Sequence, residues 1–289
     1  MLLLQNLSNA LILACTYILM AAGLTMVYGV LKVLHIAHAS VYTVGAFIGV
    51  LAFSWVGNFW VALTIAMLVS GVFGVLIYRS TYFYLLNSPR TVPLIASVGM
   101  FVMFTDLLQK PFLMGAYQRA FPAGGAGLPA IKTALFSFTP KQVLILLVTI
   151  ILLAIVYLIL TRTKLGLSWQ AASMDRDMAS AVGINLNQSI AANFFLGSAL
   201  AGAAGVLVGV YNNSVFATMG DLPSYKAFII IVLGGMGSLP GAILASLILA
   251  IVENFLVASI GYVLPRDSIA FLVLILMLMF RPNGLLGRE

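Results

Sequence analysis

The sequence predicts an all-α polytopic membrane protein, and its composition and the spacing of its apolar runs carry that prediction. Of its 289 residues, 63% are hydrophobic and 7% are charged, whereas a soluble domain has roughly 25% charged residues. The apolar runs approach the about 20 residues that a membrane-spanning helix needs. The 14 Lys and Arg residues, against 7 Asp and Glu, fall mainly between these runs. Such cations typically flank membrane spans, so we expect contact with lipid and no nucleic-acid partner.

The length rule places eight main spans and one shorter run. The spans are residues 7–30, 36–55, 59–78, 92–108, 143–160, 190–211, 242–260 and 269–280. The shorter run, residues 225–234, cannot cross a bilayer alone. We therefore expect eight or nine transmembrane helices within one domain over residues 1–289.

Two further stretches carry predictions of their own. The first span contains Cys15, the single cysteine, so we expect no disulfide and no cysteine-based metal site. No Lys or Arg precedes Lys32, so we expect this run to be a structural span and not a signal peptide. Residues 110–141 are rich in Pro and Gly and predict an external loop, with a short interfacial helix near residues 130–138.

One connecting segment, residues 165–185, is amphipathic and hydrophilic. Its apolar residues recur at spacings of three and four and define one helical face: Ala171, Met174, Met178, Ala181 and Val182. Asp175, Arg176 and Asp177 lie off that face. Ser168 as N-cap and Gly183 as C′ residue predict a single short helix. A solvated interhelical loop is the alternative interpretation.

Glycine interrupts an apolar region in each half of the chain, within residues 28–49 and within residues 234–241. We expect the first helix to break at Gly29. In transporters, corresponding breaks in two halves indicate a substrate pathway lined by unwound backbone, although tight helix packing through glycine is the alternative. The residues predicted to line the pathway are Tyr28, Gly29, His35, His38, Tyr42, Gly234, Gly235, Gly237, Glu253 and Asn254.

A few polar residues stand within or beside the apolar runs. His35 and His38 have a spacing that metal ligands use, but the sequence offers no third ligand. We therefore expect no metal, and we expect one or both to line a polar seam or to satisfy backbone groups beside Gly29. Asp106 lies at the edge of a span. Glu253 and Asn254 lie deeper, where an ionisable group is a functional candidate; a packing role and a pathway role are both open.

Sequence motifs for chemistry are absent. The chain contains no phosphate-binding G-x-x-x-x-G-K-[ST] motif and no G-x-S-x-G nucleophile motif, and the segment at 235–240 fails the dinucleotide pattern at its last position. We therefore expect no cofactor bound by this chain and no enzymatic activity of its own.

Four segments resemble the permeases of branched-chain amino-acid ABC transporters, specifically the smaller Liv-type subunit. Residues 22–31 read AGLTMVYGVL and are followed by HIAH at 35–38; residues 232–242 read VLGGMGSLPGA and residues 280–285 read FRPNGL. The fourth segment, residues 170–185, is similar to that family's cytoplasmic coupling segment. The motifs occur in the family's order along nearly the whole chain. Three positions depart from its usual residues: His35, Ala39 and Gln170.

The resemblance implies a transmembrane subunit of a bacterial ATP-driven importer in the inner membrane. Its partners would be a second homologous permease, two cytoplasmic ATPase subunits and a periplasmic binding protein. The implied substrates are branched-chain amino acids or related solutes such as urea, amides and other amino acids. The coupling segment would contact the ATPases through Gln170, Ala171, Asp175, Arg176, Asp177, Ala179 and Gly183.

A stand-alone secondary transporter or channel is the alternative function, and it requires an ion-coupling site that Glu253 or Asp106 would have to supply. Orientation follows from the coupling segment. If that segment is cytoplasmic, Lys226 and five other cations fall outside while eight fall inside, a weak positive-inside bias.

Overall fold

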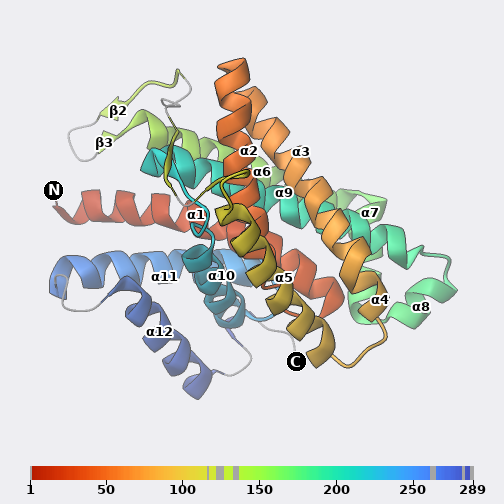
Figure 1. Cartoon of the computed structure of the whole chain (residues 1–289). Coiled ribbons are helices and arrows are strands. Elements are labelled where there is room, and N and C mark those ends of the chain that lie inside the picture. Colours follow the sequence, from red (N-terminus) through yellow and green to blue (C-terminus); the bar gives the residue numbers. More distant parts are fainter. Residues whose placement is uncertain are drawn as a thin grey trace.

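The computed structural model describes residues 2–115, 117–121, 127–132, 137–260, 265–281 and 284–286. It is helical almost throughout (Figure 1), which confirms the prediction of an all-α polytopic membrane protein. The longer helices are α1 (Leu2–Leu31), α2 (His38–Val56), α3 (Phe59–Ile77), α5 (Thr91–Gln109), α6 (Pro140–Arg162), α9 (Leu186–Asn212), α10 (Asp221–Gly234), α11 (Leu239–Ile260) and α12 (Arg266–Phe280). The shorter helices are η1 (Tyr78–Tyr82), α4 (Phe83–Leu85), α7 (Lys164–Met174) and α8 (Arg176–Ala181).

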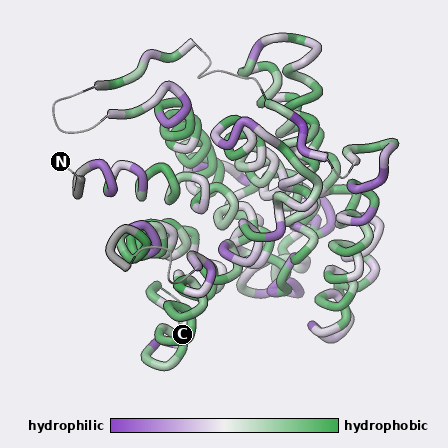
Figure 2. Tube along the Cα trace, turned by 60° about the vertical axis from the view of Figure 1, so that its left-hand side comes forward, coloured by the Kyte–Doolittle hydropathy of each residue, from purple (hydrophilic) through white to green (hydrophobic). Residues whose placement is uncertain are grey.

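Seven helices within the described part of the chain are long and apolar enough to cross a membrane. They belong to α1, α2, α3 with its continuation to Leu85, α5, α6, α9 and α11. Two apolar runs fall short of that length: α12, whose apolar part is Asp267–Phe280, and α10, which has 14 residues. Figure 2 shows hydrophobic residues along the helices and hydrophilic residues mostly at their ends and connections.

The centre of the bundle is built where α1, α2 and α9 meet through small residues. A side chain added at Gly45 of α2 would collide with the main chain of Gly202 on α9, and one added at Gly205 would collide with the carbonyl oxygen of Tyr42. Gly23 of α1 meets the carbonyl oxygen of Gly197 in the same way. Because lipid supplies no hydrophobic driving force between helices, such close backbone approach is a main source of their association.

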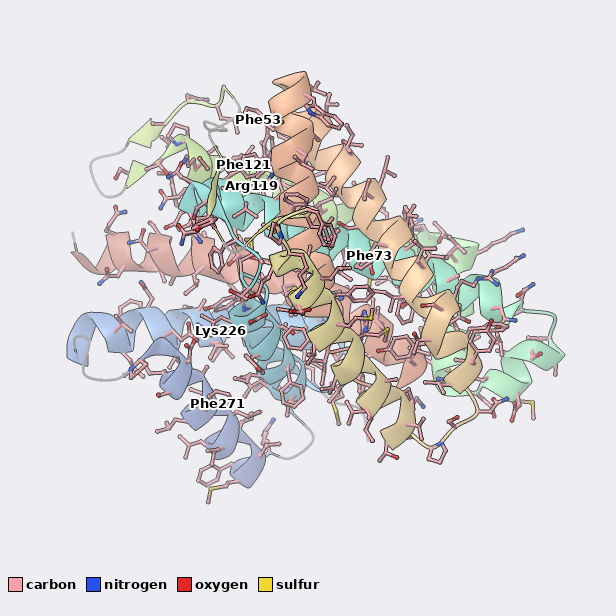
Figure 3. All side chains as sticks on the ribbon, viewed as in Figure 1. Phe53, Phe73, Arg119, Phe121, Lys226 and Phe271 are labelled. Carbon is pink, nitrogen blue, oxygen red and sulfur yellow. The ribbon has the colours of Figure 1, made fainter. Side chains whose placement is uncertain are left out.

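The two ends of the bundle can be named by short elements. At one end α1 finishes and α9 begins beside α7 and α8; we call it the α8 end. At the other, β1 (Arg119–Ala120) pairs antiparallel with β4 (Ser214–Val215), and we call it the β1 end. There Arg119 lies over the ring of Phe47 with its guanidinium carbon 5.0 Å from the ring centroid, and Phe121 packs on Phe53 (Figure 3). These contacts hold the segment that follows α5 against α2.

Helix α10 starts inside the bundle and ends at the α8 end. Gly220, its N-cap, lies against the carbonyl oxygen of Ala39 near the start of α2. Past its last residue, the chain turns through Gly235 and Gly237, both with positive φ, into α11. The predicted interruption at residues 234–241 is therefore a tight turn between two helices.

The C-terminal segment closes this turn. The main-chain N–H groups of Leu285 and Leu286 donate to the carbonyl oxygens of Leu233 and Gly234 at 2.8 and 3.0 Å. Gly284 has φ of 77° and lies against Gly235, where an added Cβ would stand 2.5 Å from the Gly235 nitrogen. The last motif of the sequence thus satisfies carbonyl groups that α10 leaves open at its end. Residues 282 and 283 of that motif lie outside the described residues.

Two local predictions were wrong. The interfacial helix near residues 130–138 is not formed, because β2 (Ile131–Lys132) and β3 (Ser137–Phe138) pair antiparallel; residues 133–136 lie outside the described ones. Helix α1 continues through Gly29 to Leu31 and ends where Lys32 takes a left-handed conformation with φ of 55°. Gly29 therefore does not break the helix, since one glycine lowers helix propensity by only about 1 kcal/mol.

Candidate functional site

A pocket of about 340 Å³ opens near the β1 end between α1, α2, α9, α10 and α11. Its volume lies in the range of about 300–1,000 Å³ that small-molecule sites occupy. Hydroxyl and amide groups alternate with aliphatic side chains along its wall, and none of the described lining residues is charged. The lining residues are Asn9, Ile12, Leu13, Thr16, Tyr17, Tyr42, Val208, Tyr211, Asn212, Pro223 and Asn254. Tyr42 and Asn254, both predicted for the pathway, line it together.

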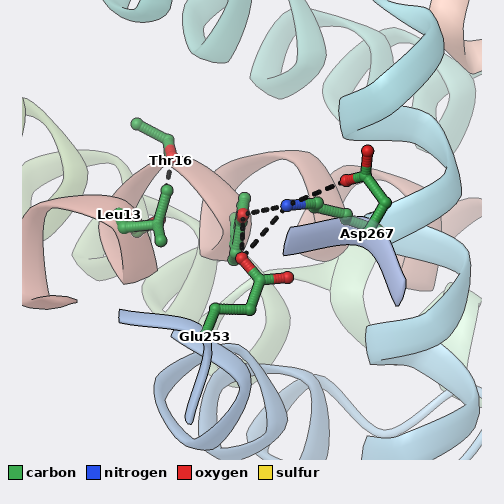
Figure 4. A network of polar contacts seen from close by, with 6 residues as sticks. Leu13, Thr16, Glu253 and Asp267 are labelled. Carbon is green, nitrogen blue, oxygen red and sulfur yellow. Dashed lines mark hydrogen bonds and ion pairs between the residues drawn. The ribbon is translucent and has the colours of Figure 1, made fainter. Parts of the chain in front are cut away.

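Behind Tyr17 lies a buried ion pair. The Nζ atom of Lys226 is 3.0 Å from Oε2 of Glu253, and the hydroxyl of Tyr17 accepts from Lys226 and donates to that same Oε2, both at 2.8 Å. Asp267 approaches Lys226 from the other side at 3.4 Å (Figure 4). Glu253 thus has a packing partner, and Lys226, which was counted among the cations on the outer side, lies inside the bundle.

The other acid considered from the sequence, Asp106, lies on the surface. Its carboxylate is 3.0 Å from Nζ of Lys110, and both side chains are largely exposed at the end of α5. An exposed pair one helical turn apart contributes little to stability. Asp106 takes no part in the pocket or in the buried ion pair.

The histidines lie between α1 and α2 and at the first residue of α2, next to an aromatic cluster. His35 and His38 are both buried, and Nδ1 of His35 is 2.9 Å from the hydroxyl of Tyr82. The His35 ring also packs on Phe194 with centroids 5.4 Å apart. Burial, followed by the charge of His38, lowers the pKa of His35, so it stays neutral at physiological pH. Among the described residues no group of three metal-ligating side chains comes together.

The two predicted glycine regions meet at the α8 end. Gly237, in the turn after α10, packs against Gly29 of α1, where a Cβ added at Gly237 would lie 3.5 Å from the Gly29 Cα atom. Gly234 lies against the carbonyl group of Gly241 across the same turn. Tyr28, next to Gly29, is half-buried in the last turn of α1.

The predicted pathway residues are therefore strung along α1 and do not form one site. Tyr42 and Asn254 line the pocket beside its first half. His38 lies beside Gly23 in its middle, and Gly237 lies beside its last turn. The sequence did not predict this arrangement along one helix, which only the structure shows.

The predicted coupling segment forms two helices where one was expected. Helix α7 begins after its N-cap Thr163 and ends at Met174, and α8 begins after Asp175, whose carboxylate accepts from the N–H groups of Asp177 and Met178 at 2.8 and 3.0 Å. The single-helix prediction and the Ser168 cap were wrong, because Asp175 adopts an extended conformation and caps a new helix. Gly183 follows α8 with φ of 87°, as predicted for a C′ glycine.

The expected apolar face of this segment points away from the bundle. Met174, Met178 and Val182 are 84%, 68% and 77% exposed. Other side chains of the segment hold it to the bundle. Trp169 is buried and its Nε1 donates to the carbonyl oxygen of Ser189 at 2.7 Å, and Ala179 is buried as well.

Of the predicted coupling residues, Arg176 points inward. Its guanidinium donates to the carbonyl oxygens of Val30 and Leu31 at 2.9 and 2.8 Å, and to that of Leu86 at 3.5 Å. Burial lowers the pKa of Arg176, which still remains protonated.

The remaining coupling residues lie nearer the surface of the segment. Gln170 and Asp177 are exposed and Ala171 is half-buried. The amide of Gln170 donates to the carbonyl oxygen of Leu160 at 3.2 Å, at the end of α6. Gln170 therefore connects α7 to the preceding span and still presents part of its side chain to solvent.

A second cavity, of about 370 Å³, lies beside Arg176 at the α8 end. It is bounded by the α1–α2 connection, the α4–α5 connection and the break between α7 and α8, and Lys32, Arg90 and Asp175 are among its lining residues. Tyr82, whose hydroxyl is 2.9 Å from His35 and whose ring packs on Phe194, lines this cavity. The structure thus has a cavity toward each end of the bundle.

Sequence analysis missed three residues that organise these sites: Tyr17, Trp169 and Lys226. Tyr17 and Trp169 read as ordinary apolar residues, and only their buried polar atoms distinguish them. Lys226 offered a signal that was not used. A lysine inside an apolar run needs a partner, and Glu253, in the next span, is the acid placed most deeply.

Comparison with known proteins agrees with this architecture. Residues 6–280 match the family described as "Branched-chain amino acid transport system / permease component". The permease protein BraD of the high-affinity branched-chain amino acid transport system of Pseudomonas aeruginosa is 34% identical, over 99% of this chain and 96% of its own. The corresponding LivH of Escherichia coli K12 is 32% identical over the same shares.

A second permease protein from Escherichia coli K12 is also similar. Its LivM is 27% identical over 95% of this chain and 68% of its own length. The chain is thus related to two permease proteins that carry the same system name. The match over nearly its whole length, together with its membrane-spanning helices, shows that this chain belongs to the family of permease components of branched-chain amino acid transport systems.

Proposed function

We propose that this chain is a membrane subunit of an ATP-driven importer of branched-chain amino acids. The near-full-length similarity to BraD and LivH carries the proposal. The partners are a second, homologous permease, two cytoplasmic ATPase subunits and a periplasmic binding protein. The chain hydrolyses no ATP and binds no cofactor, and it resides in the bacterial inner membrane with the α8 end in the cytoplasm.

The exposed face of α7 and α8 supports the assignment of the ATPase contact. Met174, Met178 and Val182 form an apolar surface on a segment that stands outside the membrane-spanning helices. Methionine suits such a surface because its flexible side chain adapts to a partner. The ATPase would press on this surface, and Arg176 would pass the displacement to the end of α1.

The arrangement of cavities supports a transport pathway. A substrate released at the β1 end would enter the 340 Å³ pocket, while the cluster around His35 blocks passage toward the 370 Å³ cavity. Movement of α1 against α9 and α10 would open one side and close the other. The pathway residues are Tyr28, Gly29, His35, His38, Tyr42, Gly234, Gly235, Gly237, Glu253 and Asn254.

The experiment reconstitutes the four kinds of subunit in vesicles and measures leucine uptake with ATP. Met178→Glu is expected to prevent co-purification of the ATPases, because it places a charge on the apolar face. Tyr117→Glu, which changes an exposed side chain near the β1 end, is the control and should leave co-purification intact. Uptake by this chain alone, driven by an ion gradient and indifferent to ATP, would contradict the proposal.

A further inference from the structure

The pocket at the β1 end and the buried ion pair share three helices. Helix α1 gives Thr16 to the pocket and Tyr17 to both; α11 gives Asn254 to the pocket and Glu253 to the ion pair. Helix α10 gives Pro223 to the pocket and Lys226, one turn later, to the ion pair. The charges therefore lie directly behind the pocket wall that Tyr17 forms.

The group of charges behind this wall is net negative and incompletely paired. One ammonium group, that of Lys226, faces the carboxylates of Glu253 and Asp267. Oε1 of Glu253 is fully buried and has no hydrogen-bond partner within the described residues, and Figure 4 shows it turned away from the contacts that Oε2 makes. Glu253 does not line the pocket itself, so its negative charge favours a cation there from behind Tyr17, whose hydroxyl donates to Oε2.

The part of the pocket wall where α10 begins favours an anion. Helix α10 begins within the bundle, and the N-terminus of a helix carries partial positive charge. Pro223 of its first turn lines the pocket. Tyr42 lines it too, and its hydroxyl is buried without a partner in the described part of the chain. Asp221 belongs to the same helix turn but is not a lining residue.

We propose that this pocket binds the zwitterionic head group of an α-amino acid. The ammonium group lies toward Tyr17 and Glu253, and the carboxylate lies toward Tyr42 and the start of α10. The aliphatic side chain packs on Ile12, Leu13 and Val208. This inference rests on the proposed function for its substrate class and adds where and how the substrate is held.

The experiment measures protection of a cysteine in the pocket. The full-length chain, in lipid nanodiscs and with Cys15→Ala, carries Thr16→Cys or Asn9→Cys and reacts with a maleimide. The probes are leucine, 4-methylpentanoate, which lacks the ammonium group, and 3-methylbutylamine, which lacks the carboxylate. Ser54→Cys, exposed near the β1 end, is the control position that no probe should protect.

Leucine is expected to slow labelling at least tenfold more effectively than either single-charge probe. Tyr42→Phe should raise the leucine concentration for half-protection at least fivefold without lowering thermal stability, because the lost hydroxyl has no partner among the described residues. Tyr157→Phe, on an exposed tyrosine of α6, should change nothing. Glu253→Gln should weaken protection as well.

The proposal is overturned if leucine gives no protection, if both single-charge probes protect equally well, or if neither pocket cysteine reacts. It is also overturned if Tyr42→Phe leaves protection unchanged. Labelling requires neither ATP nor partner subunits. A failure of ATP-driven uptake with intact leucine protection would therefore reject the proposed function alone.

Discussion

The guanidinium of Arg176 donates to the carbonyl oxygen of Leu31 at 2.8 Å and so ties α8 to the last residue of α1. A helix end leaves its final carbonyl groups without intrahelical donors, and here a residue 145 positions away in the sequence supplies them. The same α1 carries Tyr17 and Gly29. A displacement of α8 is therefore transmitted to the helix that lies beside both cavities.

Replacing Arg176 should uncouple ATP hydrolysis from transport. In Arg176→Gln most of the hydrogen bonds to Val30, Leu31 and Leu86 are lost, and a hydrogen bond to a charged group stabilises by about 1.5–3 kcal/mol. We expect ATPase subunits still to bind, because the exposed face of α8 is unchanged, while leucine uptake per ATP falls at least tenfold. Measuring both rates in vesicles checks this.

Arg162→Gln is the matched control, since Arg162 is an exposed cation at the end of α6. Its uptake per ATP should equal that of the wild type. An Arg176→Gln complex with unchanged coupling would show that the contact with α1 is merely structural.

The glycines around the α10–α11 turn should differ sharply in their tolerance of alanine. Gly29→Ala is expected to be nearly neutral, because the nearest atoms to an added Cβ are 3.9 Å away. Gly284→Ala combines φ of 77° with a Cβ 2.5 Å from the Gly235 nitrogen, and a left-handed residue with a side chain costs about 1–3 kcal/mol. Thermal unfolding of the two purified variants tests the order; equal melting temperatures would contradict it.

The fold was predictable where hydropathy and helix length decide it, and the site was predictable only in part. The runs that became α1, α2 and α9 follow directly from the cost of unpaired backbone in lipid. Asp175 shows a limit, because a residue counted on the polar face of one helix instead caps a second helix. Lys226 shows another, because its role depends on Tyr17 and Glu253, which lie 209 and 27 positions away. Local patterns do not encode such pairings.

Removing one member of the buried ion pair should destabilise the protein strongly. Removing both charges should destabilise it less. Lys226→Met leaves Glu253 buried and charged without its main partner, and removing one member of a buried pair costs about 3–5 kcal/mol. The double variant Lys226→Met/Glu253→Gln removes both charges. We expect its melting temperature to lie well above that of Lys226→Met; a double variant as unstable as the single one would mean that the charges do not act as a pair.

His35 should make stability fall as the solution becomes acidic. Burial lowers its pKa below the ordinary value of 6.5, so below that pH the unfolded chain binds a proton that the folded chain does not. Stability is therefore full above about pH 6.5 and is lost as the pH falls, by at most about 1.4 kcal/mol per pH unit for one group. In His35→Gln the melting temperature should decline less between about pH 7 and pH 5 than in the wild type. Above about pH 7 the melting temperatures of the two proteins should change in parallel. An equal decline of both melting temperatures toward acidic pH would exclude His35 as the group that titrates.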